Sequence, residues 1–308
     1  MKEYKLKQGV SKTYPITNKE DFEEQTGKSD AYKYTDKKGI IRGLAVCPAC
    51  DNPVSILGIF QKLEKQVPHA RHTNKSTIFA TFDPDAYYHC PNADPGKVKP
   101  LPTPKDRKPS TYEIKIYNTL REYFDKAIYI LNKDLNIYIS NAFARRLLMD
   151  FLQQYGYMQP NASLYNLPWM LLETSFSFSL INRMIKRNSS LWLALNEKKA
   201  DISFKPYEYK DENGDIKTSE YDLIEPKENK FLTLEAHFIH HNRKIINDDV
   251  KETITLGISD SADVPIHWIY KEEYNINTHR FLNLCVKGKD KYRNQGLLNI
   301  AEELMPNI

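Results

Sequence analysis

The feature that most constrains this chain is one short segment that concentrates cysteine and histidine. Three of the four cysteines fall between positions 47 and 90, and two of them form the pair Cys47-Pro48-Ala49-Cys50. Such a pair, on a turn between two strands, can direct both sulfurs at one ion. His69 and His72 follow after a gap of 18 residues, and His89-Cys90 after 16 more.

This spacing predicts one tetrahedral zinc ion with a structural role. Six potential ligands compete for four places, and three cysteines with one histidine make a regular closed set. His69 is the alternative for the imidazole, and His89 is the alternative for the last ligand. Catalysis is not favoured, because no acidic residue beside the cluster is an obvious general base. The predicted ligands are Cys47, Cys50, His72 and Cys90.

The same segment resembles the N-terminal zinc module of the CoiA-like competence proteins. The likeness rests on Cys47-Pro48-Ala49-Cys50, Asn52-Pro53-Val54 and Pro68-His69-Ala70-Arg71-His72, over about 45 residues. That family has a His-Phe-Ala-His segment where this chain has Ala70-Arg71 between the two histidines. In the family the module precedes a nuclease-like domain tied to DNA processing. The resemblance therefore implies a DNA-related or mobile-element setting.

Composition and charge indicate a folded intracellular protein. The apolar fraction of 41% and charged fraction of 27% are near those of globular domains, and 308 residues allow two of them. No apolar leader opens the chain, and the most apolar run, 167–181, is too short to cross a bilayer. Clustered thiols beside histidines favour a metal over disulfides. We expect a cytoplasmic location in a bacterial cell and no membrane partner. A gene carried by a phage is an alternative to a bacterial gene.

Proline divides the chain into two parts. Residues 1–93 are expected to form a small zinc-ribbon-like module, with a helix that starts near Thr17 and closes at Gly27. Strands are expected at 40–46 and 53–60, on either side of the cysteine pair, and at 77–82. A linker at 94–110 carries five prolines among lysines and arginines, and is expected to be extended.

Residues 111–308 predict an α+β main domain, with helices first and a mostly antiparallel sheet after them. Ser110-Thr111-Tyr112-Glu113 fits a capping box, and Ser140 or Asn141 caps a second helix that ends near Gly156. Asn213-Gly214 indicates a hairpin between strands 201–209 and 219–224. Helical segments are expected also at 167–185, 191–195 and 297–304. The other expected strands are 135–139, 231–239, 252–258, 265–270 and 281–286.

Outside the zinc segment, no motif of comparable quality predicts catalysis. A restriction-type nuclease needs an acidic residue, then a strand with Glu or Asp two positions before Lys. The best literal match is Asp222 with Glu225-Pro226-Lys227, which we expect to be a polar turn because it contains proline. Cys285 lies in the predicted strand 281–286 and is expected to be a buried, inert thiol.

A second group of polar residues follows one predicted strand. Glu235, His237 and His241 occupy alternate positions and are expected to share a face, with Leu232, Leu234, Ala236 and Phe238 on the other. One interpretation is a solvated polar face. The alternative is a second metal site that these three residues form together with His267.

The net charge of +4 and the pI of about 8.6 are below those of a dedicated nucleic-acid domain. Five basic residues are expected on helices, on their solvated faces, with phosphate contact as the alternative. They are Arg145, Arg146, Arg183, Lys186 and Arg187.

These observations favour a non-enzymatic binding protein that is stabilised by zinc. Aromatic residues such as Trp169, Trp192 and Trp268 provide anchors for a protein partner or for a second copy in a homo-oligomer. An inhibitor from a mobile element that coats a host protein fits this description. The alternative is nucleic-acid binding or processing through the basic module and linker, with Arg71, Lys97, Lys99, Lys105, Arg107 and Lys108.

Overall fold

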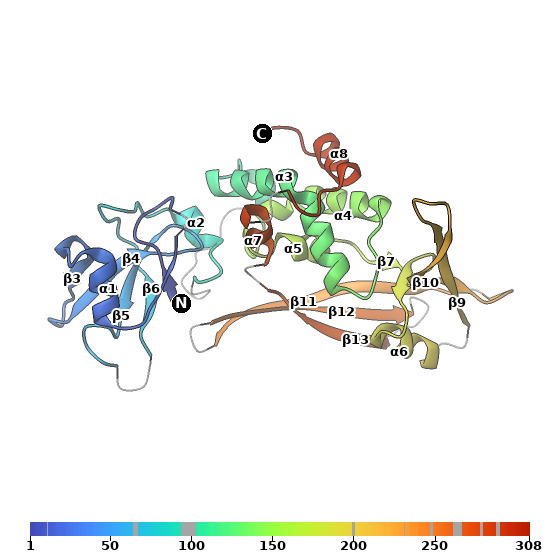
Figure 1. Cartoon of the computed structure of the whole chain (residues 1–308), viewed down its shortest axis with the longest axis horizontal. Helices are drawn as coiled ribbons and strands as arrows, with labels where there is room; N and C mark the ends of the chain where they lie inside the picture. The colour runs from blue at the N-terminus through green and yellow to red at the C-terminus, as the bar shows by residue number, and fades with distance from the viewer. Residues whose placement is uncertain are drawn as a thin grey trace. The chain divides into compact units, whose positions relative to one another are not determined.

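The computed structural model describes residues 1–10, 12–63, 67–93, 103–198, 201–230, 232–246, 249–260, 267–277, 280–287 and 290–308. The chain divides into two compact units (Figure 1). The first unit contains residues 1–112 and 243–251, and the second contains 113–242 and 252–308. Of the predicted linker, residues 94–102 lie outside the described part, and Pro104–Asp106 form a short 3-10 turn. The predicted domain boundaries at 93 and 110 stay predictions.

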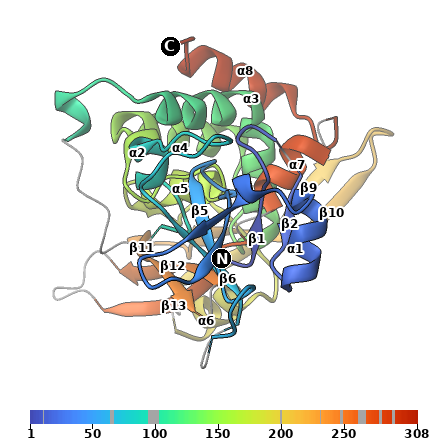
Figure 2. The same cartoon turned by 90° about the vertical axis from the view of Figure 1, so that its left-hand side faces the viewer.

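The first unit is built on a four-stranded antiparallel sheet in the order β3-β4-β5-β6, whose strands are labelled in Figure 1. Figure 2 shows β5 and β6 from another side. The strands are β3 (Lys33–Thr35), β4 (Ile41–Val46), β5 (Pro53–Leu57) and β6 (His69–His72). A small pair, β1 (Glu3–Tyr4) and β2 (Tyr14–Pro15), and the 3-10 turn Asp30–Tyr32 accompany it. The core contains Tyr4, Phe22, Val54 and Ile56.

Helix α1 (Lys19–Thr26) has the predicted ends. The side chain of Asn18 accepts a hydrogen bond from the Asp21 amide at 2.8 Å, and Gly27 closes the helix in the left-handed region, at φ 60°. The predicted strand 77–82 is wrong. Thr77 and Ala80 form only a single bridge, because the Thr77 hydroxyl accepts from the Ala80 amide and closes a tight turn. The fourth strand is instead β6, with both histidines of the motif.

The second unit combines helices with antiparallel strands, which confirms the α+β class. The first helix of this unit is α3 (Thr111–Asp134), whose buried residues include Ile116, Leu120, Phe124 and Ile128. Ser140 caps α4 (Asn141–Gln153) by accepting from the Phe143 amide. The remaining helices are α5 (Leu167–Glu173), α6 (Ser190–Lys198), α7 (Arg280–Lys287), α8 (Gln295–Leu304) and the 3-10 turn Gly156–Met158.

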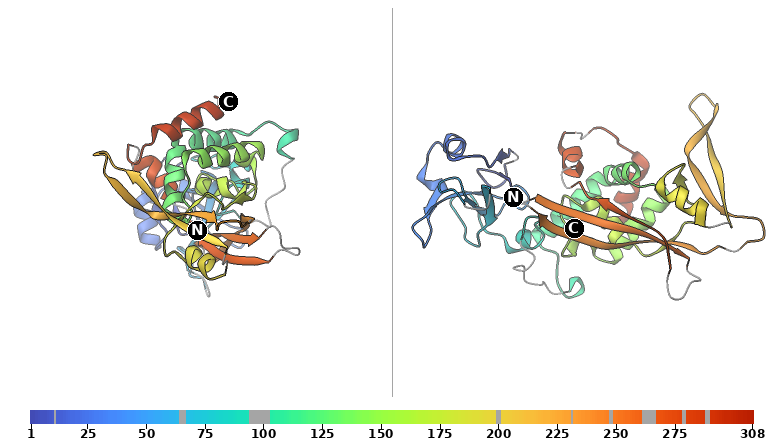
Figure 3. Two further views of the ribbon diagram at one scale, coloured as in Figure 1. Left: turned by 90° about the vertical axis from the view of Figure 1, so that its right-hand side faces the viewer. Right: turned by 90° about the horizontal axis from the view of Figure 1, so that it is seen from below.

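Two antiparallel sheets complete this unit (Figure 3). One has the order β13-β12-β11-β7, and the other β8-β10-β9. The predicted hairpin around Asn213-Gly214 is confirmed, because β9 and β10 flank it. The strands are β7 (Phe178–Ser179), β8 (Met184–Lys186), β9 (Ile202–Lys210), β10 (Ile216–Pro226), β11 (Leu234–Ile246), β12 (Asp249–Asp260) and β13 (Trp268–Asn275).

Three predicted elements of this unit are wrong. The helix expected at 167–185 ends at Glu173, and strands β7 and β8 follow, so Arg183, Lys186 and Arg187 are not on a helix. The strand expected at 135–139 is a single bridge between Ile137 and Ile185. The strand expected at 281–286 is helix α7. Its buried residues Phe281 and Cys285 are four apart, which puts them on one helical face.

Candidate metal centre

The turn between β4 and β5 carries two of the four candidate ligands. The amide of Cys47 donates to the carbonyl of Asn52 at 2.8 Å, and the amide of Asp51 donates back to the carbonyl of Cys47 at 3.1 Å. Asp51 adopts the left-handed region, at φ 59°, which Asp tolerates better than most residues. The tight turn holds Cys47 and Cys50 beside each other.

Strand pairing and a short helix bring the other two ligands to this turn. His72 is the last residue of β6 and pairs with Val54 of β5, so it lies directly across from the end of the turn. Helix α2 (Pro84–Tyr88) is capped by Asp83, whose carboxylate accepts from the amides of Asp85 and Ala86. Cys90 follows α2 and donates its amide to the carbonyl of Tyr87 at 3.1 Å.

Cys47, Cys50, His72 and Cys90 could therefore hold one metal ion. Their ligand atoms all lie within 4.8 Å of one another. The Nε2 atom of His72 is 3.2 Å from the sulfur of Cys50 and 3.6 Å from that of Cys90. The sulfurs of Cys47 and Cys90 are 3.7 Å apart, much longer than a disulfide bond of about 2.05 Å.

Asn52 connects the two halves of this cluster. Its side-chain nitrogen donates to the sulfur of Cys50 at 3.3 Å and to the carbonyl of Asp83 at 3.0 Å. Its side-chain oxygen accepts from the Asp83 amide at 2.6 Å. Asn52 is fully buried, so the turn is fixed to the start of α2 from inside. Sequence reasoning missed this role, although Asn52 follows the cysteine pair by only two positions.

Burial makes the cluster unfavourable without a cation. The three thiols are 0%, 5% and 0% exposed, and burial raises the pKa of Cys50 and of Cys90 well above the usual range. Burial also acts to raise the pKa of Cys47, but hydrogen bonds with Cys50 and Cys90 outweigh it and hold this pKa well below the usual range. Desolvation opposes three thiolates in one place, and a bound divalent cation supplies the opposite charge they need.

The two alternative ligands do not belong to the cluster. His69 is buried with its Nδ1 atom 2.9 Å from the carbonyl of Val67. The buried ring of His89 lies between Tyr88 and Tyr112, at centroid distances of 4.9 and 5.6 Å. Among the described residues, only Cys47, Cys50, His72 and Cys90 form such a group.

The second predicted metal group, Glu235 with His237 and His241, is not assembled. His240 adopts the left-handed region, at φ 53°, and the alternation of β11 shifts there. Ala236 and Phe238 are buried before this point, whereas the side chain of His241, only 5% exposed, is buried after it. Glu235 and His237 remain partly exposed, and His267 ahead of β13 is exposed.

His237 does not form a hydrolytic triad either. Its Nε2 atom lies 3.2 Å from the hydroxyl of Ser259 and 3.9 Å from the carboxylate of Glu235. A triad needs the acid and the nucleophile on opposite ring nitrogens. The group is therefore a polar cluster on the sheet.

His241 instead links two carboxylates inside the second unit. Its Nδ1 and Nε2 atoms each lie 2.5 Å from a carboxylate oxygen, of Glu173 on α5 and of Glu252 on β12. Asn166 donates to the same oxygen of Glu252 at 2.6 Å. Although burial lowers it, these hydrogen bonds raise the pKa of His241 from 6.5 to about 9.

The polar turn predicted at Glu225-Pro226, in the nuclease-like match, is wrong. Glu225 and Pro226 belong to β10, paired with Ser203 and Ile202, and do not form the expected polar turn. Asp222 is buried and accepts from the guanidinium of Arg187 and from the indole of Trp192, at 2.6 and 2.9 Å. This carboxylate is already bound within the unit. Cys285 is a buried free thiol on α7, and burial raises its pKa to about 12.

Comparison of the chain with protein-family models, with curated proteins and with solved structures gives no significant match. In the described part of the chain, no helix has the length and apolar character needed to cross a membrane.

The bond network of His241 predicts a specific pH dependence of stability. A histidine whose pKa rises on folding stabilises the native state fully below pH 6.5, and this contribution is lost as the pH rises through about 9. The free energy of unfolding should fall by up to about 3 kcal/mol over this range. Urea titrations at several pH values, followed by tryptophan fluorescence, measure it, because all three tryptophans are in the second unit.

His241→Gln should flatten this pH dependence, whereas His240→Gln, at the exposed neighbouring position, should keep it. A free energy of unfolding that rises between pH 6.5 and 9 in the parent chain contradicts the assignment.

Proposed function

We propose that Cys47, Cys50, His72 and Cys90 hold one structural Zn²⁺ and that the chain is a non-enzymatic binding protein. Zinc bonds of about 2.3 Å to sulfur and 2.0 Å to nitrogen give tetrahedral edges of about 3.8 Å between sulfurs and about 3.5 Å from sulfur to nitrogen. The corresponding distances here are 3.7 Å between Cys47 and Cys90, and 3.2 and 3.6 Å from His72. These three separations are close to the edges of a zinc tetrahedron, which supports zinc as the ion.

A structural ion fits this set better than a catalytic one. Protein side chains fill all four places, and catalytic zinc keeps one place for water or substrate. The cysteines are buried, and Asn52 fixes the turn to α2. An ion here would join the turn between β4 and β5, the end of β6 and the segment after α2 at one point.

Substitution of one ligand should remove the ion. Cys47→Ser should release about one zinc per chain, and the first unit should lose its folded structure while the second keeps its native tryptophan fluorescence. Cys285→Ser is the matched control, because this thiol is buried on α7 outside the cluster. Emission spectroscopy of the purified variants measures the metal content. Equal zinc content in the two variants would disprove the site.

The observation that carries the binding function is the exposed hairpin of β9 and β10. Tyr207, Tyr209 and Ile216 are 42%, 48% and 67% exposed. β8 pairs with β10 only at residues 221–223, so the outer part of the hairpin is two-stranded (Figure 3). A two-stranded hairpin gains little stability by itself. Exposed tyrosines on such an element are typical anchors for a protein partner.

The hairpin tyrosines should carry the affinity for the partner. Tyr207→Ala combined with Tyr209→Ala should reduce capture of a stoichiometric host protein by at least about tenfold, while the stability of the chain changes by less than about 0.5 kcal/mol. Affinity capture followed by mass spectrometry measures it. Tyr34→Ala is the control, because Tyr34 is 39% exposed in the first unit. Equal loss in both variants, or none, contradicts the assignment. A mobile-element inhibitor remains the proposed setting.

Nucleic-acid binding is the second candidate, because the charge is unevenly distributed. Residues 1–112 carry 19 Lys and Arg against 13 Asp and Glu, whereas the rest carries 25 against 27. The resemblance to the CoiA-like module favours the same function.

This candidate predicts a DNA complex at low salt that weakens steeply as salt is added. Charge contacts release counterions, so affinity should fall by orders of magnitude between about 50 and 200 mM salt. A gel-shift titration with the full chain measures it. If no complex forms at low salt, nucleic-acid binding is excluded.

A further inference from the structure

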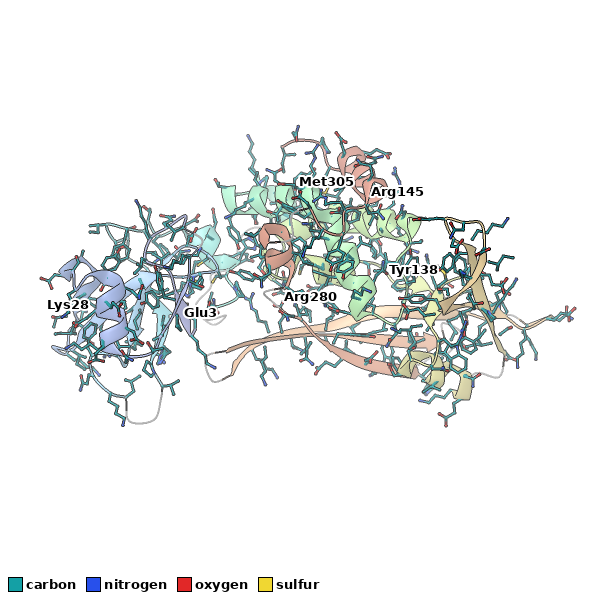
Figure 4. All side chains as sticks on the ribbon, viewed as in Figure 1. Glu3, Lys28, Tyr138, Arg145, Arg280 and Met305 are labelled. Atoms are coloured by element: carbon teal, nitrogen blue, oxygen red, sulfur yellow. The ribbon has the colours of Figure 1, made fainter. Side chains whose placement is uncertain are left out.

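The five basic residues that the sequence groups together have different surroundings in the second unit. Arg145 lies beside α8 (Figure 4), and three of the five residues have a carboxylate oxygen within 3.2 Å. These pairs are Arg145 with Glu303 at 2.5 Å, Lys186 with Glu220 at 3.2 Å and Arg187 with Asp222 at 2.6 Å. Arg183 and Arg146 differ from these three.

Arg183 has a guanidinium that no acidic side chain in the described part of the chain neutralises. It stacks on the ring of Phe143, with its Cζ atom 4.2 Å from the ring centroid. Within the described part of the chain, its side chain makes neither a hydrogen bond nor an ion pair, so all five N–H donors are available. Burial, followed by the positive charge of Arg146, lowers its pKa, and the guanidinium still remains charged at neutral pH.

Arg146 lies on the same face of α4 as Phe143, the residue on which Arg183 stacks. It is three residues after Phe143, so the two side chains are neighbours on the helix surface. One of its terminal nitrogens donates to the carbonyl of Ser177 at 3.1 Å. The nearest carboxylate is that of Asp150, 3.9 Å from the Nε atom, which is at the limit of an ion pair. The side chain is 44% exposed and accessible from solvent.

We propose that Arg183 and Arg146 form a binding site for a tetrahedral oxyanion of the phosphate class. Each guanidinium offers a planar fork of donors that matches the oxygens of phosphate, and two forks from different elements can hold one anion from two sides. An anion between them also removes the repulsion between two positive charges that Asp150 offsets only weakly. The site uses neither the metal ligands nor the exposed tyrosines of the hairpin.

Titration of the full chain with inorganic phosphate tests this site. The titration is done at pH 7.5, with chloride as the reference salt at equal ionic strength. One phosphate per chain should bind saturably. Arg183→Gln should weaken binding at least about tenfold, because charge-assisted hydrogen bonds to the anion are lost. Arg146→Gln should weaken it as well, and this exposed substitution leaves the core unchanged.

Arg145→Gln is the matched control, since Arg145 is adjacent on α4 and its guanidinium is already bound to Glu303. It should bind phosphate as the parent does. The proposal is overturned if the parent chain shows no saturable binding, if Arg146→Gln binds as tightly as the parent, or if all three variants weaken equally.

Discussion

The first unit depends on one constraint: four side chains from three separate segments meet within 4.8 Å of one another. Two come from the turn between β4 and β5, one from the end of β6, and one from the segment after α2. Three buried thiols are costly to bring together without a cation, because desolvation opposes each thiolate. A bound ion would reverse this cost and would fix the turn, the sheet edge and the segment after the short helix at one point.

The second unit is held together differently. The apolar residues of α3, α4 and α5 form a core of ordinary composition, with Leu120, Phe124 and Leu147 among the fully buried side chains. Two of its buried charged groups are paired: Asp222 with Arg187, and His241 with two carboxylates. Among the described residues of this unit, no group of side chains is arranged to hold a metal ion, so loss of the proposed ion is expected to affect mainly the first unit.

Sequence spacing was sufficient for the candidate ligands and for the class of fold. A Cys-x-x-Cys pair restricts the conformation of the turn that carries it. The Asn-Gly pair and the Ser140 cap determine only the structure of the residues next to them. The predictions were wrong in segments whose structure depends on packing against residues far away in the sequence. The segment 281–286 fits either period, and burial of Phe281 and Cys285 on one face favours the helix. The shift at His240 moved His241 from the predicted polar face into the interior.

Charge pairing was the other property that the sequence could not provide. The sequence around Arg145, Arg183 and Arg187 does not indicate which guanidinium has an acidic partner, and only the fold shows that Glu303 and Asp222 pair with two of them. These partners are far away in sequence, so no local pattern distinguishes a neutralised guanidinium from an available one. The hydrogen bonds of Asn52 to Asp83 are likewise a consequence of the tertiary arrangement.

X-ray absorption spectroscopy at the zinc edge, on the chain purified without added metal, tests the central claim most directly. The account predicts about one zinc per chain, with three sulfur neighbours at about 2.3 Å and one nitrogen at about 2.0 Å. A chain that contains no zinc, or whose zinc has only nitrogen and oxygen neighbours, would contradict it.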